Sequence, residues 1–147
     1  MEQQNEQNLN LSVCACRSLR MTTRVITQYY DKALRISGLK SPQFALLTDI
    51  CSRENGISVN ELANQAMMDQ TTVTRNVEIL RKKGYVDVKT EDADSRKKCI
   101  TVSETGKEKL ALAMPHWQEA QSRLEQIVGK EQYDELLKTL SVLRNLE

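Results

Sequence analysis

Between residues 58 and 75 the sequence places hydroxyl, amide and guanidinium side chains at helical spacing. In a helix that starts near residue 70, Gln70, Thr74 and Arg75 fall on one open face. Amides and hydroxyls can bond base edges or phosphates, and arginine can make a bidentate contact with guanine. The pattern therefore predicts a surface that reads nucleic acid. Its candidate contact residues are Ser58, Asn60, Gln70, Thr71, Thr72, Thr74 and Arg75.

Two short helices must hold these side chains. The first is expected to begin at Ser58, which can form an S-x-x-E capping box with Glu61. The second is expected to begin at the N-cap residue Asp69 and to end before Gly84, after a cationic last turn. Its apolar stripe comprises Val73, Val77 and Leu80. Taken alone, this second helix also fits an ordinary amphipathic surface helix.

A two-stranded hairpin is predicted directly after these helices. Apolar residues alternate at 85–88 and again at 98–102, as they do in paired strands. The polar segment between the strands carries the further candidate contacts Asp94, Arg96 and Lys97. A charged hairpin tip packs poorly against protein, but arginine is favoured along a phosphate backbone or in a minor groove. Two helices followed by such a hairpin form a winged helix-turn-helix, which places one helix in the DNA major groove.

Long helices are predicted on both sides of this core. Apolar residues step by three or four from 11 to 36, and Ser41 is expected to cap the next helix. Another helix should begin at Ser103 and be kinked by Pro115, and the last should follow Gly129. The leucine stripe of the last helix has little core to pack against, so a symmetric dimer is expected. The alternative is that both ends fold back onto their own core.

Three segments of the chain resemble the MarR family of bacterial and archaeal regulators. They are the run T-T-V-T-R-N-V-E-I-L-R-K-K-G-Y-V, the run G-L-K-S-P-Q-F-A-L-L at 38–47, and a wing signature of Asp94, Arg96, Val102, Ser103 and Gly106. The family usually has Leu-Thr where this chain has Val102-Ser103. The resemblance implies a mainly α fold with a small β-hairpin wing, in a single domain over residues 1–147. The winged-helix core would span about 40–102, and dimerisation helices about 11–36 and 103–146.

The same resemblance implies how such a protein works. A homodimer, joined through its first and last two helices, would bind double-stranded DNA at a palindromic operator. Its two half-sites would lie about one helical turn apart. The expected role is that of a repressor that a small-molecule effector releases from DNA.

Composition agrees with a sequence-reading regulator. The net charge is +1 and charged residues make up 28% of the 147 residues, so the chain is not basic throughout. That argues against a binder that relies on charge alone. The polar N-terminus predicts no signal peptide, and no apolar run approaches the roughly 20 residues that span a bilayer. A cytoplasmic protein without membrane contact is expected, with its four cysteines mostly reduced.

No enzyme activity, cofactor or metal site is predicted. The single histidine, His116, is expected to be a polar residue on a helix rather than a general base. The sequence contains no glycine-rich phosphate loop, no G-x-S-x-G and no H-E-x-x-H motif. The acidic residues at 91–94 lie in a loop, where solvation explains them.

The effector remains open between two classes, of which an organic acid is the first. Arg17, Arg20 and Arg24 form a basic row opposite the apolar stripe of the first helix. Beside Tyr29, Tyr30 or Trp117, such an arginine could clamp the carboxylate of a small aromatic acid. The resemblance places ligands of this kind in a crevice between the dimer helices and the DNA-binding core. A solvated basic helix face explains the row equally well.

Thiol oxidation is the second class. In the hydroperoxide-sensing branch of the family a cysteine near Cys16 is reactive and held by two tyrosines. Tyr30 matches one of these tyrosines, but Ser41 stands in place of the other. Two residues apart in a helix, Cys14 and Cys16 would point about 200° away from each other. They are therefore not expected to share a metal or to form a disulfide. The alternative is that these cysteines are small, buried hydrophobic residues.

Overall fold

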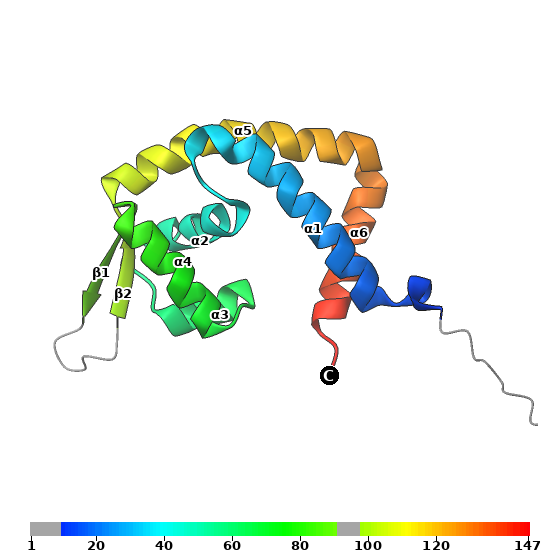
Figure 1. Cartoon of the computed structure of the whole chain (residues 1–147), viewed down its shortest axis with the longest axis horizontal. Coiled ribbons are helices and arrows are strands. Elements are labelled where there is room, and N and C mark those ends of the chain that lie inside the picture. Colours follow the sequence, from blue (N-terminus) through cyan, green and yellow to red (C-terminus); the bar gives the residue numbers. More distant parts are fainter. Residues whose placement is uncertain (1–9, 91–97) are drawn as a thin grey trace, which may run out of the picture.

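The chain folds into six α-helices and one hairpin within the residues that the structure describes, which are 10–90 and 98–147 (Figure 1). The structure is a computed structural model. Its helices are α1 (Ala15–Leu34), α2 (Ser41–Cys51), α3 (Val59–Ala66), α4 (Gln70–Lys82), α5 (Glu104–Val128) and α6 (Lys130–Arg144). The strands are β1 (Val86–Thr90) and β2 (Lys98–Val102), and the 3-10 turns are η1 (Leu11–Val13) and η2 (Arg35–Ser37). The predicted fold class, mainly α with a small hairpin, is confirmed.

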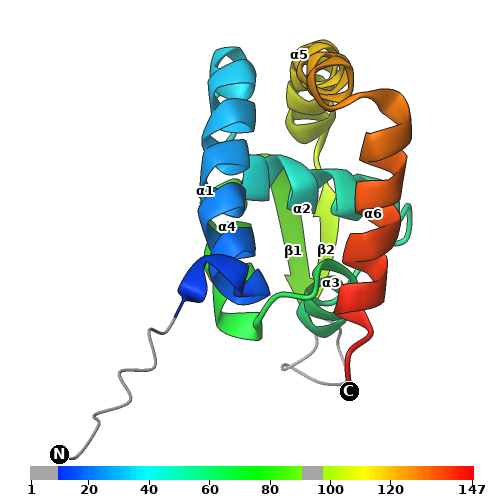
Figure 2. The same ribbon diagram turned by 90° about the vertical axis from the view of Figure 1, so that its right-hand side faces the viewer.

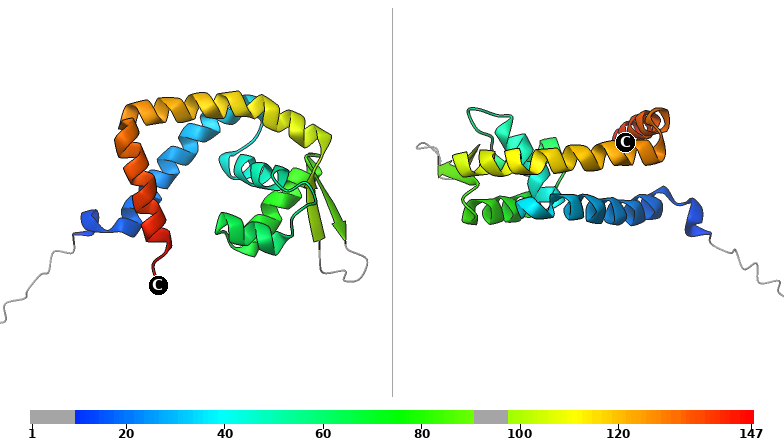
Figure 3. Two further views of the ribbon diagram at one scale, coloured as in Figure 1. Left: turned by 180° about the vertical axis from the view of Figure 1, so that it is seen from behind. Right: turned by 90° about the horizontal axis from the view of Figure 1, so that it is seen from above.

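The long helix α5 connects two parts of the molecule. Helices α2, α3 and α4 and the hairpin gather at its N-terminal end, whereas α6 turns back from its C-terminal end (Figures 1 and 2). Helix α1 runs alongside α5 and contacts it (Figure 3). We call the first part the winged part and the second, formed by α1, α6 and the C-terminal half of α5, the arm.

The hydrophobic core lies in the winged part. Its fully buried large side chains are Leu34, Leu39, Leu46, Leu47, Ile50, Ile57, Leu62, Val73, Leu80, Val86 and Ile100. Full burial of one such side chain stabilises the fold by roughly 1.5–3 kcal/mol. Helix α6 has no buried residue and packs against α5 instead of this core. The structure therefore does not show the alternative in which both ends of the chain fold back onto their own core.

The hairpin is fixed to the core through one additional pairing. Within the hairpin Val86 pairs with Val102, and Val88 with Ile100, in antiparallel register. Ile57 then exchanges two backbone hydrogen bonds with Ile100, at 3.0 and 2.8 Å. This bridge joins β2 to the segment between α2 and α3, so the orientation of the hairpin depends on the helix-turn-helix.

The expected cap at Ser41 is wrong. Lys40 occupies the N-cap position of α2, and Ser41 is its first helical residue. Both the backbone N–H and the hydroxyl of Ser41 donate to Oδ1 of Asp31, each at 2.6 Å. Asp31 lies on α1, so these bonds connect α1 to the start of α2. A bond between residues ten positions apart has no signature in local sequence.

The first helix differs from expectation at both of its ends. The helix expected over 11–36 is interrupted at Cys14, which is extended (φ −77°, ψ 116°), and its last residues form η2. Pro115 lies inside α5, which continues through it as one helix with halves that run in different directions in Figure 1. Gly129, with φ 94°, separates α5 from α6 as predicted.

Candidate functional site

Helices α3 and α4 begin with the caps that the sequence predicts. The Ser58 hydroxyl accepts a hydrogen bond from the Glu61 N–H at 3.1 Å. Asp69 Oδ1 accepts one from the Thr72 N–H at 2.8 Å, and Thr72 Oγ1 donates to Asp69 Oδ2 at 2.8 Å. The hydrogen bonds from Thr72 lower the pKa of Asp69. Ser58 and Thr72, both candidate contact residues, therefore also hold the starts of these two helices.

Helix α4 separates its apolar and polar sides as predicted. Val73, Val77 and Leu80 are buried. The exposed candidate residues on its N-terminal half are Gln70, Thr71, Thr74 and Arg75, and Asn60 is exposed on α3. Figure 1 shows the start of α4 beside α3. The end of β1 and the start of β2 point toward the same side of the molecule. The start of α4 and the hairpin ends thus lie on the same side of the molecule.

The charged side chains of α4 differ in whether they have a partner within the chain. Glu78 binds Arg81 through two hydrogen bonds, at 2.9 and 2.7 Å, and this contact lowers the pKa of Glu78. Arg75 is exposed and forms no salt bridge with any residue in the described ranges 10–90 and 98–147. An exposed guanidinium without an internal partner keeps its donors available for a bidentate contact.

Three of the predicted contacts come from the sequence between β1 and β2. Asp94, Arg96 and Lys97 lie outside the described residues. The base of the wing is described, and Lys89 and Lys98 are exposed on its two strands.

A close junction connects the hairpin to α5. The Ser103 N–H donates to the Tyr85 carbonyl at 3.0 Å, and the Ser103 hydroxyl donates to the Gly84 carbonyl at 2.5 Å. That hydroxyl also accepts from the Gly106 N–H at 3.0 Å. A Cβ atom at Gly106 would collide with the Tyr85 carbonyl and lie 2.9 Å from Val102 Cγ2. The V-S-x-x-G segment thus joins the wing to the helix that leads into the arm, a contact that the sequence analysis did not identify.

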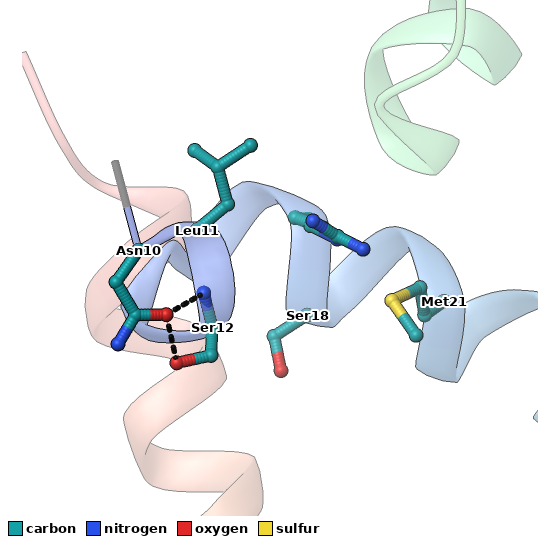
Figure 4. A pocket seen from close by; sticks show the side chains of 6 residues that line it. Asn10, Leu11, Ser12, Ser18 and Met21 are labelled. Atoms are coloured by element: carbon teal, nitrogen blue, oxygen red, sulfur yellow. Dashed lines mark hydrogen bonds between the residues drawn. The ribbon is translucent and has the colours of Figure 1, made fainter. Parts of the chain in front are cut away.

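The candidate ligand residues do not line one cavity. Arg17 borders a hollow of about 500 Å³ beside η1, lined by Asn10, Leu11, Ser12, Ser18 and Met21 (Figure 4). Arg20 borders an apolar hollow of about 610 Å³ between α1 and α6. Tyr29 lines a third, of about 330 Å³, between α1 and α5. Arg24 is exposed on α1 and is not among the residues lining these three hollows.

The two tyrosine hydroxyls already have partners. Tyr29 donates to the Ala120 carbonyl at 2.8 Å. Tyr30 donates to Gln121 Oε1, and Gln121 Nε2 donates to the Tyr133 hydroxyl at 2.8 Å. Burial raises the pKa of Tyr30 to about 12. This chain of bonds connects α1, α5 and α6, so it stabilises the arm.

Cys14 and Cys16 differ from the arrangement expected of them. Cys14 precedes the first helical residue, so the 200° separation expected for two helical residues does not describe this pair. Cys16 is exposed and borders the hollow between α1 and α6. Fourteen residues of helix place Tyr30 roughly 21 Å along α1 from Cys16. The two side chains therefore do not meet within one protomer.

Neither a metal-binding cluster nor a membrane-spanning helix is found among the described residues. No group of three or more His, Cys, Asp or Glu residues is placed to hold a metal ion in 10–90 and 98–147. None of the described helices is long and apolar enough to span a bilayer. His116, half-buried on α5, lines the hollow that also contains Tyr29.

Comparisons with known proteins agree with this geometry. The sequence model of a family described as the MarR family matches residues 37–97, a range that includes α2, α3, α4 and β1. The regulator SarZ of Staphylococcus haemolyticus (strain JCSC1435) is 30% identical over 96 residues, 65% of this chain and 65% of its own length. The alignment thus spans less than two thirds of that curated relative.

The solved structures give longer matches. The M. tuberculosis transcriptional regulator MosR is 30% identical, covers 93% of this chain and all of its own chain, and superposes with a TM-score of 0.79. A second MosR structure, described as a complex with DNA, is 34% identical with a TM-score of 0.75 and covers 90% of this chain and 99% of its own.

Proposed function

Because the chain belongs to the MarR family of transcriptional regulators, we propose that it represses transcription by binding a palindromic DNA operator as a homodimer. The observation that carries this proposal is the exposed polar face on the N-terminal half of α4, with Arg75 unpaired among the described residues. This half lies on the side of the molecule toward which the hairpin strands point. The MosR structure described as a complex with DNA supports a DNA-binding role. A palindrome suits two copies related by a two-fold axis.

Each part of the surface has a proposed task. Arg75 reads a base edge in the major groove, because its fork is free to make a bidentate contact. Gln70, Thr71 and Thr74 bond bases or phosphates beside it, and Ser58, Asn60 and Thr72 position the two helices on the backbone. Asp94, Arg96 and Lys97 form the wing contact, with Arg96 directed along the minor groove.

The arm supplies the proposed dimer interface. Its exposed large apolar side chains include Leu19, Met21 and Val25 on α1, and Leu136, Leu137 and Val142 on α6. Apolar surface of this extent on two neighbouring helices marks an interaction site on a soluble chain. A second copy packed on the arm would bury it, and would fix two winged parts at a defined separation. On this basis we assign residues of about 40–102 to DNA binding, and about 11–36 and 103–146 to dimerisation.

Replacing Arg75 with alanine should weaken binding to a cognate duplex by about 1–3 kcal/mol, because a base contact is lost. Arg96→Ala should weaken binding as well, through the wing. Arg123→Ala is the matched control, since Arg123 is exposed on α5 and its loss removes the same charge far from α4. Fluorescence anisotropy on a duplex that the wild-type protein selects from a random pool gives the affinities.

Salt provides an independent check on this test. Phosphate contacts release counterions, so the wild-type affinity should fall steeply as salt rises. Arg75→Ala and Arg96→Ala variants that stay folded and bind as tightly as Arg123→Ala would show that this surface does not bind DNA.

We propose that an effector releases the repressor, and that it is a small organic acid. Arginines border two of the hollows beside α1, and the third, lined by Tyr29, also contains Lys32, His116 and Arg123. An arginine beside an aromatic wall can clamp a carboxylate. Titrating the protein–DNA complex with salicylate should therefore release DNA, and Arg17→Ala, Arg20→Ala and Arg24→Ala variants show which arginine the acid needs.

Thiol oxidation is the second candidate, because Cys16 is exposed and borders the same apolar hollow as Arg20. A cationic neighbour stabilises a thiolate, which attacks a hydroperoxide oxygen to give a sulfenic acid and an alcohol. If Cys16 is the sensor, Cys16→Ser should keep DNA affinity within about twofold and lose release by cumene hydroperoxide. Cys51→Ser, on α2, is the control. Release that persists in Cys16→Ser, or is absent in the wild type, leaves the organic acid as the effector.

A further inference from the structure

Met67 has an unusual backbone conformation in the turn between α3 and α4. Its φ of 51° and ψ of 43° are left-handed, and it is the one residue other than glycine with positive φ in the described ranges. An L side chain in this region crowds the following carbonyl, which is why helices usually place glycine here. The turn itself is satisfied by backbone bonds, since Met68 N–H donates to the Ala63 carbonyl at 3.0 Å. Glycine would make the same bonds without the strain.

The side chain of Met67 contributes little to the core. It is 68% exposed, whereas the next residue, Met68, packs against the core cluster. All other exposed large apolar residues in the described part of the chain lie before residue 38 or after residue 103. They are Leu11, Val13, Leu19, Met21, Val25, Ile36, Leu112, Ile127, Leu136, Leu137, Val142 and Leu146. Among the described residues of 38–103, Met67 is therefore the single exposed large apolar side chain, and the backbone is strained where it stands.

The position of Met67 indicates what this side chain meets. It lies two residues before the N-cap Asp69 and three before Gln70, at the end of α4 that carries the exposed polar residues. Figure 1 places this turn on the side toward which the hairpin strands also point. If α4 enters the major groove by its N-terminal half, Met67 lies at the groove edge. The 5-methyl group of thymine is the apolar feature that bases present there.

We propose that Met67 determines specificity by packing against a thymine methyl group beside the start of α4. This inference rests on the proposed DNA-binding function. The unbranched thioether of methionine is flexible and polarisable, so it can follow the surface of a methyl group. Strained residues that the fold does not need are typical of functional sites. Here the strain directs an apolar side chain outward at the DNA-facing end of the helix-turn-helix.

Two substitutions separate the backbone from the side chain. Met67→Gly removes the strain, so its unfolding equilibrium constant should fall by about threefold. It also removes the apolar contact, so its affinity for the selected duplex should fall by about tenfold. Met67→Ala keeps a Cβ in the left-handed region, so it should lose the same affinity with no gain in stability. Urea unfolding and fluorescence anisotropy on the full-length protein measure the two quantities.

Replacing each thymine of the selected duplex with deoxyuridine, one position at a time, tests the contact directly. One position should weaken wild-type binding by about threefold to fivefold, and should have no effect on binding by Met67→Ala. Equal affinities of the wild type and both variants, or the absence of any uracil position whose effect depends on Met67, would overturn the inference. Failure of the wild type to select any duplex would instead contradict the proposed function.

Discussion

Replacing Gly106 with alanine should destabilise the fold by about 3 kcal/mol or more, although alanine in a helix interior normally stabilises relative to glycine by about 1 kcal/mol. Gly106 lies in the first turn of α5, where an added Cβ meets the Tyr85 carbonyl and Val102 Cγ2. Backbone atoms cannot rotate away as a flexible side chain can. The helix would have to move off the hairpin, and the bonds from Ser103 to Tyr85 and Gly84 would be lost. Urea unfolding followed by circular dichroism measures the change.

Gly84 is the matched comparison for this prediction. It has a φ of 78°, and a Cβ there would meet nothing within 4 Å. Gly84→Ala should therefore cost only the left-handed strain, about 1–2 kcal/mol. The test is which of the two variants is less stable. Helix propensity alone predicts the opposite order of stability, because it favours alanine over glycine inside a helix. A Gly106→Ala protein as stable as the wild type would mean that the hairpin and α5 are not in close contact.

The sequence predicted those parts of the structure that depend on neighbouring residues. The predicted caps at Ser58 and Asp69 follow from hydrogen bonds within one helical turn, and both are present. The helix predicted to begin at Ser103 has Ser103 as its N-cap. The buried stripe of α4 follows from its period, because only one side of the helix can face the core. Exposure of Gln70 and Arg75 is the other consequence of the same period.

The features that were missed depend on residues far apart in the chain. The Ser41–Asp31 contact, the Ile57–Ile100 bridge and the Ser103–Gly84 bond each join separate elements. No local pattern indicates such pairings, since they arise only when the elements pack. The same reason explains why Arg17, Arg20 and Tyr29 are close in sequence but border different hollows.

The strain at Met67 illustrates a third kind of feature. The sequence shows a methionine pair before an N-cap, which is consistent with a turn of any type. Only the structure shows that the backbone of Met67 is left-handed and its side chain exposed, whereas the side chain of Met68 packs against the core. Local preference would put glycine at this position, so the departure from that preference draws attention to function rather than to stability.

Leu136→Glu should convert the proposed dimer into a monomer and reduce affinity for the palindromic duplex by about 100-fold or more. Leu136 is 41% exposed on α6, within the apolar surface that a second copy would cover. Burying an unpaired carboxylate at that interface costs several kcal/mol. With the dimer lost, the two half-sites bind independently, and the gain from linking two binding modules disappears. Analytical ultracentrifugation and anisotropy on whole-site and half-site duplexes measure both effects.

Lys138→Glu is the control for this variant. At 100° per residue it places the same acidic group about 200° around α6 from Leu136, and it breaks only an exposed ion pair with Glu135. It should remain dimeric and bind the palindrome. Removal of residues 130–147 deletes α6 completely, so it should give monomeric or aggregated protein that does not bind the palindrome. A truncated protein that is stable, monomeric and fully active on the palindrome would show instead that each winged part recognises DNA alone. The exposed leucines of the arm would then need another partner.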